Sequence, residues 1–97
     1  MLDSCFIRNS SCVTRTIGGE TIIIPVSGNV ADLESIYTLN ELGSSVWNRI
    51  DGKTPLATII EEFRELYEVT KTELERDIVA FMEELKSLGL VHSHGAD

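Results

Sequence analysis

Four side chains of this chain could bind a metal ion or supply a thiol: Cys5 and Cys12 near its start, and His92 and His94 near its end. Two thiols alone make a poor zinc site, because structural zinc takes four ligands. A disulfide between the two cysteines is an alternative, although such bonds are rare in cytosolic proteins. The His-x-His pattern could bind a metal, but its place in a polar end segment favours a frayed tail. We therefore predict no metal site, no cofactor and a flexible tail over residues 92–97.

The remaining polar residues do not form a recognisable catalytic pattern. Ser4, Ser10 and Ser11 have no histidine placed in the sequence to act as their base. The sequence contains no Walker-type loop, no G-x-G-x-x-G and no H-E-x-x-H. Most carboxylates fall on helix faces opposite the apolar stripes and are typical of solvated surface, as at Glu61, Glu62, Glu65 and Glu68. We predict no catalytic residues and no enzymatic activity.

Length and charge narrow the remaining classes of protein. A chain of 97 residues is long enough for one domain and too short for two, so residues 1–97 are predicted to form a single domain. The net charge of −8 repels nucleic-acid phosphates and anionic lipids, and it favours cationic or neutral partners. No apolar run approaches the roughly 20 residues that span a bilayer. The first residues lack the apolar stretch of a signal peptide, so we expect a cytoplasmic protein without a membrane or nucleic-acid partner.

The first half of the chain has the pattern of a small antiparallel sheet over about residues 12–38. Residues 12–26 are rich in β-branched side chains, and Gly18-Gly19 at their centre is a strong hairpin signal. Pro25 lacks an amide hydrogen, which marks a sheet edge or a strand end. Residues 27–32 read as a turn, and a weaker third strand follows over residues 33–38.

The second half has the period of helices, which we predict at about residues 40–51, 55–67 and 71–88. Asn40 can cap the first helix, and Asp51-Gly52 can end it. Thr54 can cap the second helix, with Pro55 at its first helical position. Thr70 and Glu73 form a capping box before the third helix. The expected apolar stripe of the second helix is Leu56, Ile59, Ile60, Phe63, Leu66 and Tyr67, and that of the third is Leu74, Ile78, Phe81, Leu85 and Leu88.

These elements predict an α+β, winged-helix-like fold, in which a three-stranded antiparallel sheet is followed by a three-helix bundle. Many proteins with this outline bind DNA, but a recognition helix needs positive charge to approach phosphates. The third helix carries more acids than bases: Glu73, Glu75, Asp77, Glu83 and Glu84 against Lys71, Arg76 and Lys86. The charge therefore opposes DNA binding, which stays as an alternative beside a general protein-docking adaptor.

The order of motifs in the second half resembles the PqqD family, the pyrroloquinoline-quinone biosynthesis protein D. The resemblance covers about residues 35–91, including the segments YTLNELGSSVWNRIDGKTPLATIIEEF and ERDIVAFMEELKSLGLV. The matching features are Leu39-Asn40 before a short helix, Trp47 followed by Ile50-Asp51-Gly52, Thr54 with Ile59, Asp77, and the closing residues 85–91.

This resemblance implies a function that the residues alone do not reveal. PqqD-like domains bind the leader segment of ribosomally made, post-translationally modified peptides and present the precursor to a modifying enzyme, often a radical S-adenosylmethionine enzyme. The implied partners are a precursor leader peptide and a radical SAM or other peptide-modifying enzyme. The peptide need not be the precursor of the quinone.

A peptide could add a strand to the free edge of the third strand, beside a second ridge of the third helix. The predicted peptide-binding residues are Leu33, Glu34, Ser35, Ile36 and Tyr37 on the strand, and Glu75, Val79, Met82, Glu83 and Lys86 on the helix. Val79 and Met82 would form the apolar wall of the groove, with ordinary core positions as the alternative. Nearby acids would attract a basic leader.

Overall fold

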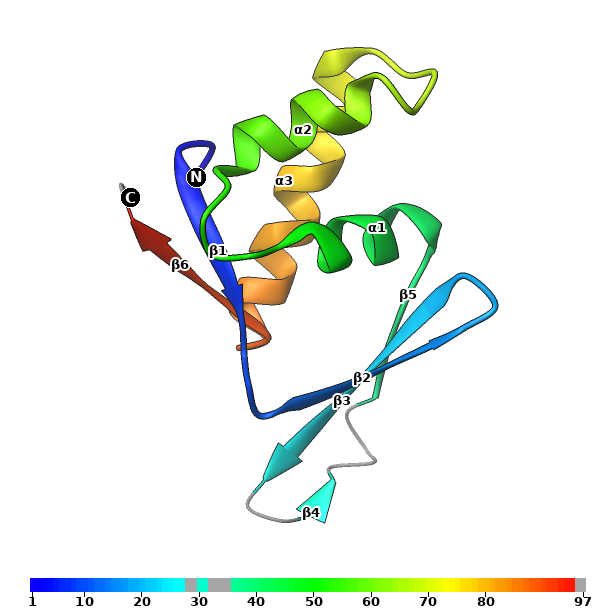
Figure 1. Ribbon diagram of the computed structural model, residues 1–97, viewed down its shortest axis with the longest axis vertical. Helices are drawn as coiled ribbons and strands as arrows, with labels where there is room; N and C mark the ends of the chain where they lie inside the picture. Colours follow the sequence, from blue (N-terminus) through cyan, green and yellow to red (C-terminus); the bar gives the residue numbers. More distant parts are fainter. Residues whose placement is uncertain (28–29, 32–35, 96–97) are drawn as a thin grey trace.

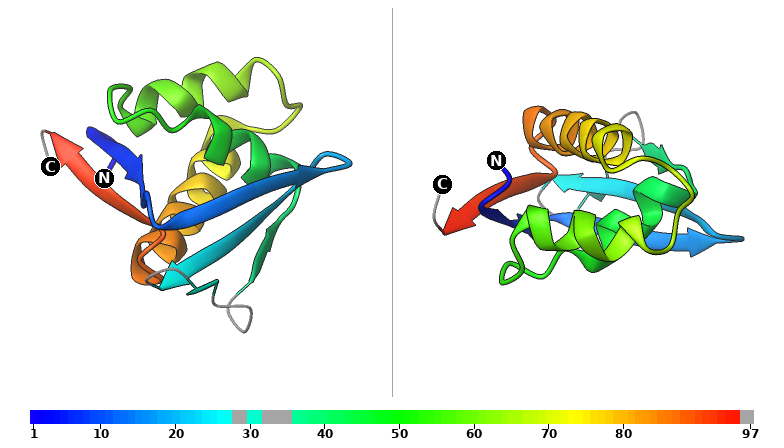
Figure 2. Two further views of the ribbon diagram at one scale, coloured as in Figure 1. Left: turned by 60° about the horizontal axis from the view of Figure 1, so that its bottom comes forward. Right: turned by 90° about the horizontal axis from the view of Figure 1, so that it is seen from above.

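The computed structural model describes residues 1–27, 30–31 and 36–95. Strands β2 (Cys12–Ile17), β3 (Glu20–Ser27) and β5 (Tyr37–Leu39) form a three-stranded antiparallel sheet, and the two-residue strand β4 (Val30–Ala31) pairs with the end of β3. Strands β1 (Ser4–Arg8) and β6 (Val91–Gly95) form a separate antiparallel pair. The helices are α1 (Glu41–Arg49), α2 (Leu56–Arg64) and α3 (Lys71–Ser87). Figures 1 and 2 show the helices gathered beside the β2–β3 hairpin, with β1–β6 at their other side.

The predicted hairpin is confirmed. Gly18 and Gly19 have φ values of 58° and 86°, the left-handed conformation that a two-residue turn of this kind requires. The turn sets the register, which runs from Ile17 opposite Glu20 to Cys12 opposite Pro25. The strand predicted at residues 33–38 corresponds to β5, which ends one residue later than predicted. Its predicted start cannot be compared, because residues 32–35 lie outside the described residues. Strand β4 falls in the segment predicted as a turn.

Two of the three predicted helix caps are confirmed. The Asn40 side chain accepts a hydrogen bond of 2.8 Å from the backbone N–H of Gly43. The Thr70 hydroxyl accepts one of 3.2 Å from the N–H of Glu73. Each satisfies a donor that the first turn of the helix leaves without a partner. Helix α1 ends at Arg49, two residues earlier than predicted.

The predicted cap of α2 is wrong, because Thr54 belongs to the preceding turn. Asp51 accepts hydrogen bonds of 2.8 Å from the backbone N–H groups of both Lys53 and Thr54, and the Thr54 hydroxyl donates to the same carboxylate. Pro55 therefore occupies the cap position without a side-chain hydrogen bond. Helix α2 also ends at Arg64 rather than at residue 67, and the predicted core residue Leu66 is 73% exposed.

Arg49, in the last turn of α1, connects this turn to α2. Its guanidinium donates two hydrogen bonds, of 2.7 and 2.9 Å, to the two carboxylate oxygens of Glu62, and a third to Asp51. These contacts join the end of α1 to the exposed face of α2.

The flexible tail predicted at residues 92–97 is wrong over the part that the structure describes, since residues 91–95 form β6. Gly89, with φ of 76°, reverses the chain after α3. The strand then pairs with β1, from Arg8 opposite Val91 to Ser4 opposite Gly95. Residues 96–97 lie outside the described residues. A partner strand at the far end of the chain orders a segment whose own composition predicts disorder.

The core lies between the helices and the inner face of the sheet. Ile23 and Leu39 contribute from the sheet, Phe6 and Val91 from the β1–β6 pair, and all are buried. Trp47 is 1% exposed, and its indole N–H donates a 3.3 Å hydrogen bond to the Thr14 hydroxyl on β2. The helices contribute most of the other core residues: Val46 and Trp47, then Leu56, Ile59, Ile60 and Phe63, then Leu74, Ile78, Met82 and Leu85. Ile50, just after α1, and Leu90, just before β6, complete the core. None of the helices in the described part of the chain is both long and apolar enough to cross a membrane.

Candidate functional site

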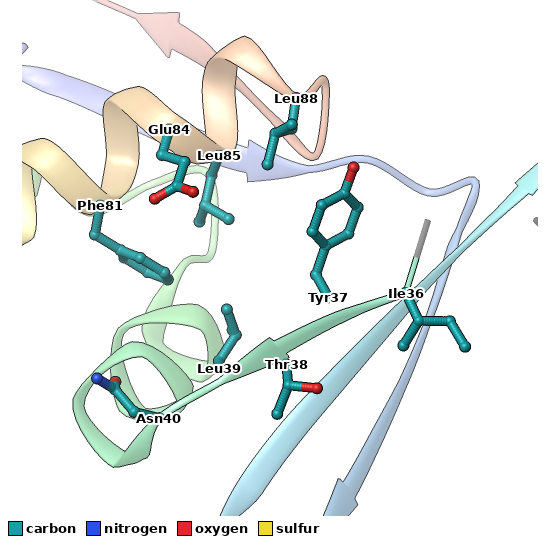
Figure 3. Close-up of a pocket in the computed structure, with 9 residues that line it drawn as sticks. All are labelled: Ile36, Tyr37, Thr38, Leu39, Asn40, Phe81, Glu84, Leu85 and Leu88. Carbon is teal, nitrogen blue, oxygen red and sulfur yellow. The ribbon is translucent and has the colours of Figure 1, made fainter. Parts of the chain in front are cut away.

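A groove of about 330 Å³ lies between β5 and α3 (Figure 3). One wall is the strand and its flanking residues, and the other is one face of the helix. Tyr37 lies at the Leu88 end of the groove and Asn40 at the Phe81 end, so the strand runs alongside the helix in the opposite direction. The lining residues are Ile36, Tyr37, Thr38, Leu39 and Asn40 from the strand side, and Phe81, Glu84, Leu85 and Leu88 from the helix.

The strand wall presents backbone groups as well as side chains. Within the described residues β5 pairs only with β3, through Tyr37 opposite Ile23 and Leu39 opposite Thr21. No other described strand pairs with the opposite edge of β5, and a strand edge of this kind can accept a further strand. Leu39 is buried in the core and holds β5 in place, while Ile36 is 45% exposed at the open end.

The helix wall is a single face of α3, because residues 81, 84, 85 and 88 are spaced by three or four positions. Leu85 is buried, Phe81 is half-buried and Leu88 is 42% exposed. The wall is therefore firmly seated in the core yet leaves apolar surface open. Such a wall suits apolar side chains of a bound segment.

A smaller hollow of about 90 Å³ adjoins the Phe81 end of the groove. Asn40 and Phe81 line both spaces, and Leu42, Gly43, Val46 and Ile78 complete the smaller one. The absence of a side chain on Gly43 makes room for the Phe81 ring, since a Cβ atom there would lie 3.3 Å from it. The Phe81 ring thus separates the groove from an apolar recess under α1.

The structure brings together only part of the predicted site. Of the predicted strand residues, Ile36 and Tyr37 line the groove, and Leu33, Glu34 and Ser35 lie outside the described residues. The predicted wall of Val79 and Met82 is wrong. Met82 has no exposed surface, and Val79 is half-buried against the core, so the alternative of ordinary core positions holds.

The other predicted helix residues also lie away from the groove. Glu75 lines a different hollow, near Leu2, Ala57 and Ile60. Glu83 and Lys86 are exposed but do not line the groove. The predicted residues of α3 therefore lie on a different face of the helix from the one that meets β5.

Seven lining residues were missing from the predicted site: Thr38, Leu39, Asn40, Phe81, Glu84, Leu85 and Leu88. Phe81 and Met82 are adjacent, so α3 carries two overlapping apolar stripes, and the sequence does not decide between them. Of the predicted core stripe, Leu74, Ile78 and Leu85 are buried, whereas Phe81 is half-buried and Leu88 is 42% exposed. Met82, beside Phe81, is fully buried instead.

Other residues with chemical potential do not converge on the groove. Cys5 and Cys12 are free thiols, so the alternative of a disulfide does not hold, and burial raises the pKa of Cys12. His94 lies opposite Cys5 in the β1–β6 pair. Over residues 1–27, 30–31 and 36–95, no three His, Cys, Asp or Glu side chains form a group that could hold a metal ion.

Comparison with known proteins adds a family and a structural relative. The family model described as Coenzyme PQQ synthesis protein D (PqqD) matches residues 29–91, a span that contains every lining residue of the groove. None of the curated proteins matches the chain. A solved structure described as TbiB1 in complex with the TbiA(beta) leader peptide is similar, with a TM-score of 0.75 and 18% sequence identity. The similarity covers 91% of this chain and 96% of that one, and at this identity it shows a shared fold.

Proposed function

Because this chain belongs to the PqqD family, we propose that it is a recognition element that binds the leader segment of a ribosomally synthesised precursor peptide. The observation that carries the proposal is the edge of β5 that pairs with no other described strand, beside the open apolar face of α3. The structural relative TbiB1, which shares this fold, was solved with a leader peptide, and this supports the proposal.

The geometry suits an extended peptide that adds a strand to β5. Backbone hydrogen bonds to the strand edge supply affinity for any extended segment, and side-chain contacts beside it supply selectivity. A flexible leader loses conformational freedom as it binds, which offsets about 2–5 kcal/mol of the gross interaction. Affinity therefore depends on a few buried anchors, for which Phe81 and Leu88 offer the open apolar surface.

We further propose that the bound precursor is delivered to a modifying enzyme, a radical SAM enzyme or one of another class, and that this chain has no catalytic activity itself. Family membership supports both points. We propose a cytoplasmic location, a single domain over residues 1–97, and a winged-helix-like arrangement of the sheet and helices. The order of β2, β3 and β5 before the three helices supports that arrangement, although β1 precedes and β6 follows them.

The test is a titration of isotope-labelled protein with a synthetic leader peptide, followed through the amide shifts. The leader is taken from any short precursor-like reading frame found beside the gene. We expect the shifts to cluster on β5 and on the residues of α3 that line the groove. Leu88→Asp should weaken binding by tenfold or more, about 1.4 kcal/mol, because it places a charge in the apolar wall. Leu66→Asp is the matched control, since Leu66 is exposed and does not line the groove.

Two outcomes would contradict the proposal. Shifts confined to residues 12–24, with β5 and α3 unaffected, would place the peptide elsewhere. Equal affinities of the two leucine variants would show that the groove is not the binding surface.

A further inference from the structure

The described lining of the groove contains one charged side chain, that of Glu84. Figure 3 shows its carboxylate directed into the space between α3 and β5, with Phe81 on one side and Leu88 on the other. Its neighbours in the lining are apolar or uncharged, so the character of the groove is apolar with one negative charge near its middle.

Among the described residues, no cation pairs with this carboxylate. The ion pairs of the described residues involve Asp51, Glu61, Glu62 and Asp77 as acids, and Glu84 is in none of them. The residues outside the description, 28–29, 32–35 and 96–97, include no Lys, Arg or His. In the free protein Glu84 is exposed and therefore hydrated.

Binding changes the surroundings of Glu84, because a strand added to β5 would cover the groove. A carboxylate that loses water without gaining a partner costs free energy. A ligand that brings a positive charge offsets this cost, whereas one that brings a negative charge adds repulsion. The groove therefore discriminates between peptides by charge at one position, in addition to their apolar contacts.

The spacing of the lining residues relates that position to an apolar one. From Phe81 to Leu88 the helix rises about 10.5 Å, at about 1.5 Å per residue. Side chains on one face of an added strand recur about every 6.6 Å, at about 3.3 Å per residue. Glu84 lies about 6 Å along the helix from Leu88 and about 4.5 Å from Phe81. Two neighbouring inward-facing side chains thus fit along this wall, one at Glu84 and the other toward Leu88 or Phe81.

Resting on the proposed function, we propose that Glu84 selects leader segments that carry a Lys or Arg two positions away from a large apolar residue. The basic side chain lies over the Glu84 carboxylate, and the apolar one packs against Phe81 or Leu88. The substrate class is therefore an extended peptide with an alternating basic and apolar pair, not merely a peptide of positive net charge.

The test uses a phage-displayed library of random dodecapeptides, selected in parallel on the wild-type protein, on Glu84→Lys and on Glu83→Lys. Glu83 is the matched control, because it is the adjacent exposed acid on α3 and does not line the groove. We expect wild type and Glu83→Lys to enrich the same basic–x–apolar or apolar–x–basic pattern. Glu84→Lys should enrich an acidic residue at the basic position. With one selected peptide, exchange of its basic residue for Glu should weaken binding to wild type at least tenfold, and Glu84→Lys should restore it.

The outcomes separate this inference from the function on which it rests. Selected peptides that shift the amides of β5 and α3 but lack a basic residue at a fixed position would overturn the role of Glu84 and leave peptide recognition standing. A pattern that changes equally in both variants would show a general effect of net charge and would also overturn it. Selected peptides that leave β5 and α3 unshifted would contradict the proposed function itself.

Discussion

At the scale of single residues, Trp47 combines a fully buried ring with one polar contact to the sheet. Trp47→Ala should reduce the free energy of unfolding by about 3–5 kcal/mol, because it removes a large ring and leaves a cavity. Trp47→Phe should cost less, since it keeps one aromatic ring in the core and loses the second ring and the hydrogen bond to Thr14. Denaturant melting measures both. An unchanged midpoint for Trp47→Ala, together with lost peptide binding, would make Trp47 a contact residue instead.

Asp51 makes stability depend on pH. Hydrogen bonds from the backbone N–H groups of Lys53 and Thr54, then from the Thr54 hydroxyl, hold the pKa of Asp51 well below its ordinary value of 3.8. A carboxylate with a lowered pKa in the folded state stabilises the fold above its unfolded pKa, and this contribution is lost as the pH falls toward the folded value. Protonation of Asp51 therefore favours unfolding in acid.

We expect Asp51→Asn to lose less stability than wild type as the pH falls from about 5 to about 2, although it is less stable at neutral pH. Thermal melting across this range provides the measurement. Asp3→Asn serves as the control, because it removes an exposed carboxylate that accepts no described hydrogen bond. Parallel acid-unfolding curves for wild type and Asp51→Asn would refute the role of this turn.

At the scale of secondary-structure elements, the sequence predicts the features that depend only on neighbouring residues. Gly18-Gly19, Asn40 and Thr70 act within a few residues, so the hairpin turn and two helix starts could be read from the sequence. The start of α2 could not be predicted in this way, because Thr54 could either cap the helix or bond to Asp51. In the structure it bonds to Asp51. The inward face of α3 could not be read either. Phe81 and Met82 are both apolar, and only the packing of the other helices decides which one is buried.

Gly43 tests how α1 shapes the groove. In Gly43→Ala the new Cβ atom would lie 3.2 Å from the Asn40 side chain and 3.3 Å from the Phe81 ring, so the ring has to move toward the groove. We expect peptide binding to weaken by about 0.5–1.5 kcal/mol, the cost of holding a side chain off its preferred rotamer. Overall stability should change little, because the preference of Ala over Gly for a helix, about 1 kcal/mol, offsets the cost of moving the ring. Calorimetric titration checks the affinity, with the exposed Asn48→Ala of α1 as the control. Full affinity in Gly43→Ala would show that Phe81 does not limit the groove.

At the scale of the whole molecule, charge separates peptide recognition from the DNA-binding alternative. The net charge is −8, and α3 itself carries more acids than bases. Neutralising phosphates is the main source of affinity for duplex DNA, so we expect no mobility shift with random or operator-like DNA at physiological salt. Tight binding that weakens steeply with salt would support the alternative and argue against peptide recognition.

The pairing of β1 with β6 joins distant parts of the chain, and no local sequence pattern predicts it. The two strands lie at opposite ends of the sequence, and β6 is polar enough to be read as a tail. What holds them is tertiary: Phe6, Leu90 and Val91 are buried in the common core.

This pairing also has a consequence for the order of folding. Bringing β1 and β6 together in an otherwise unfolded chain closes a loop of about 90 residues, at an entropic cost of roughly 4 kcal/mol. The β2–β3 hairpin and the helices close only short loops, so they can form first and bring the two ends near each other. The β1–β6 pair then completes the structure, and until it does the inner side chains of β1 remain open to water. Pulsed hydrogen exchange during refolding should therefore show the amides of β1 and β6 gaining protection after those of β2 and β3, and simultaneous protection would contradict this order.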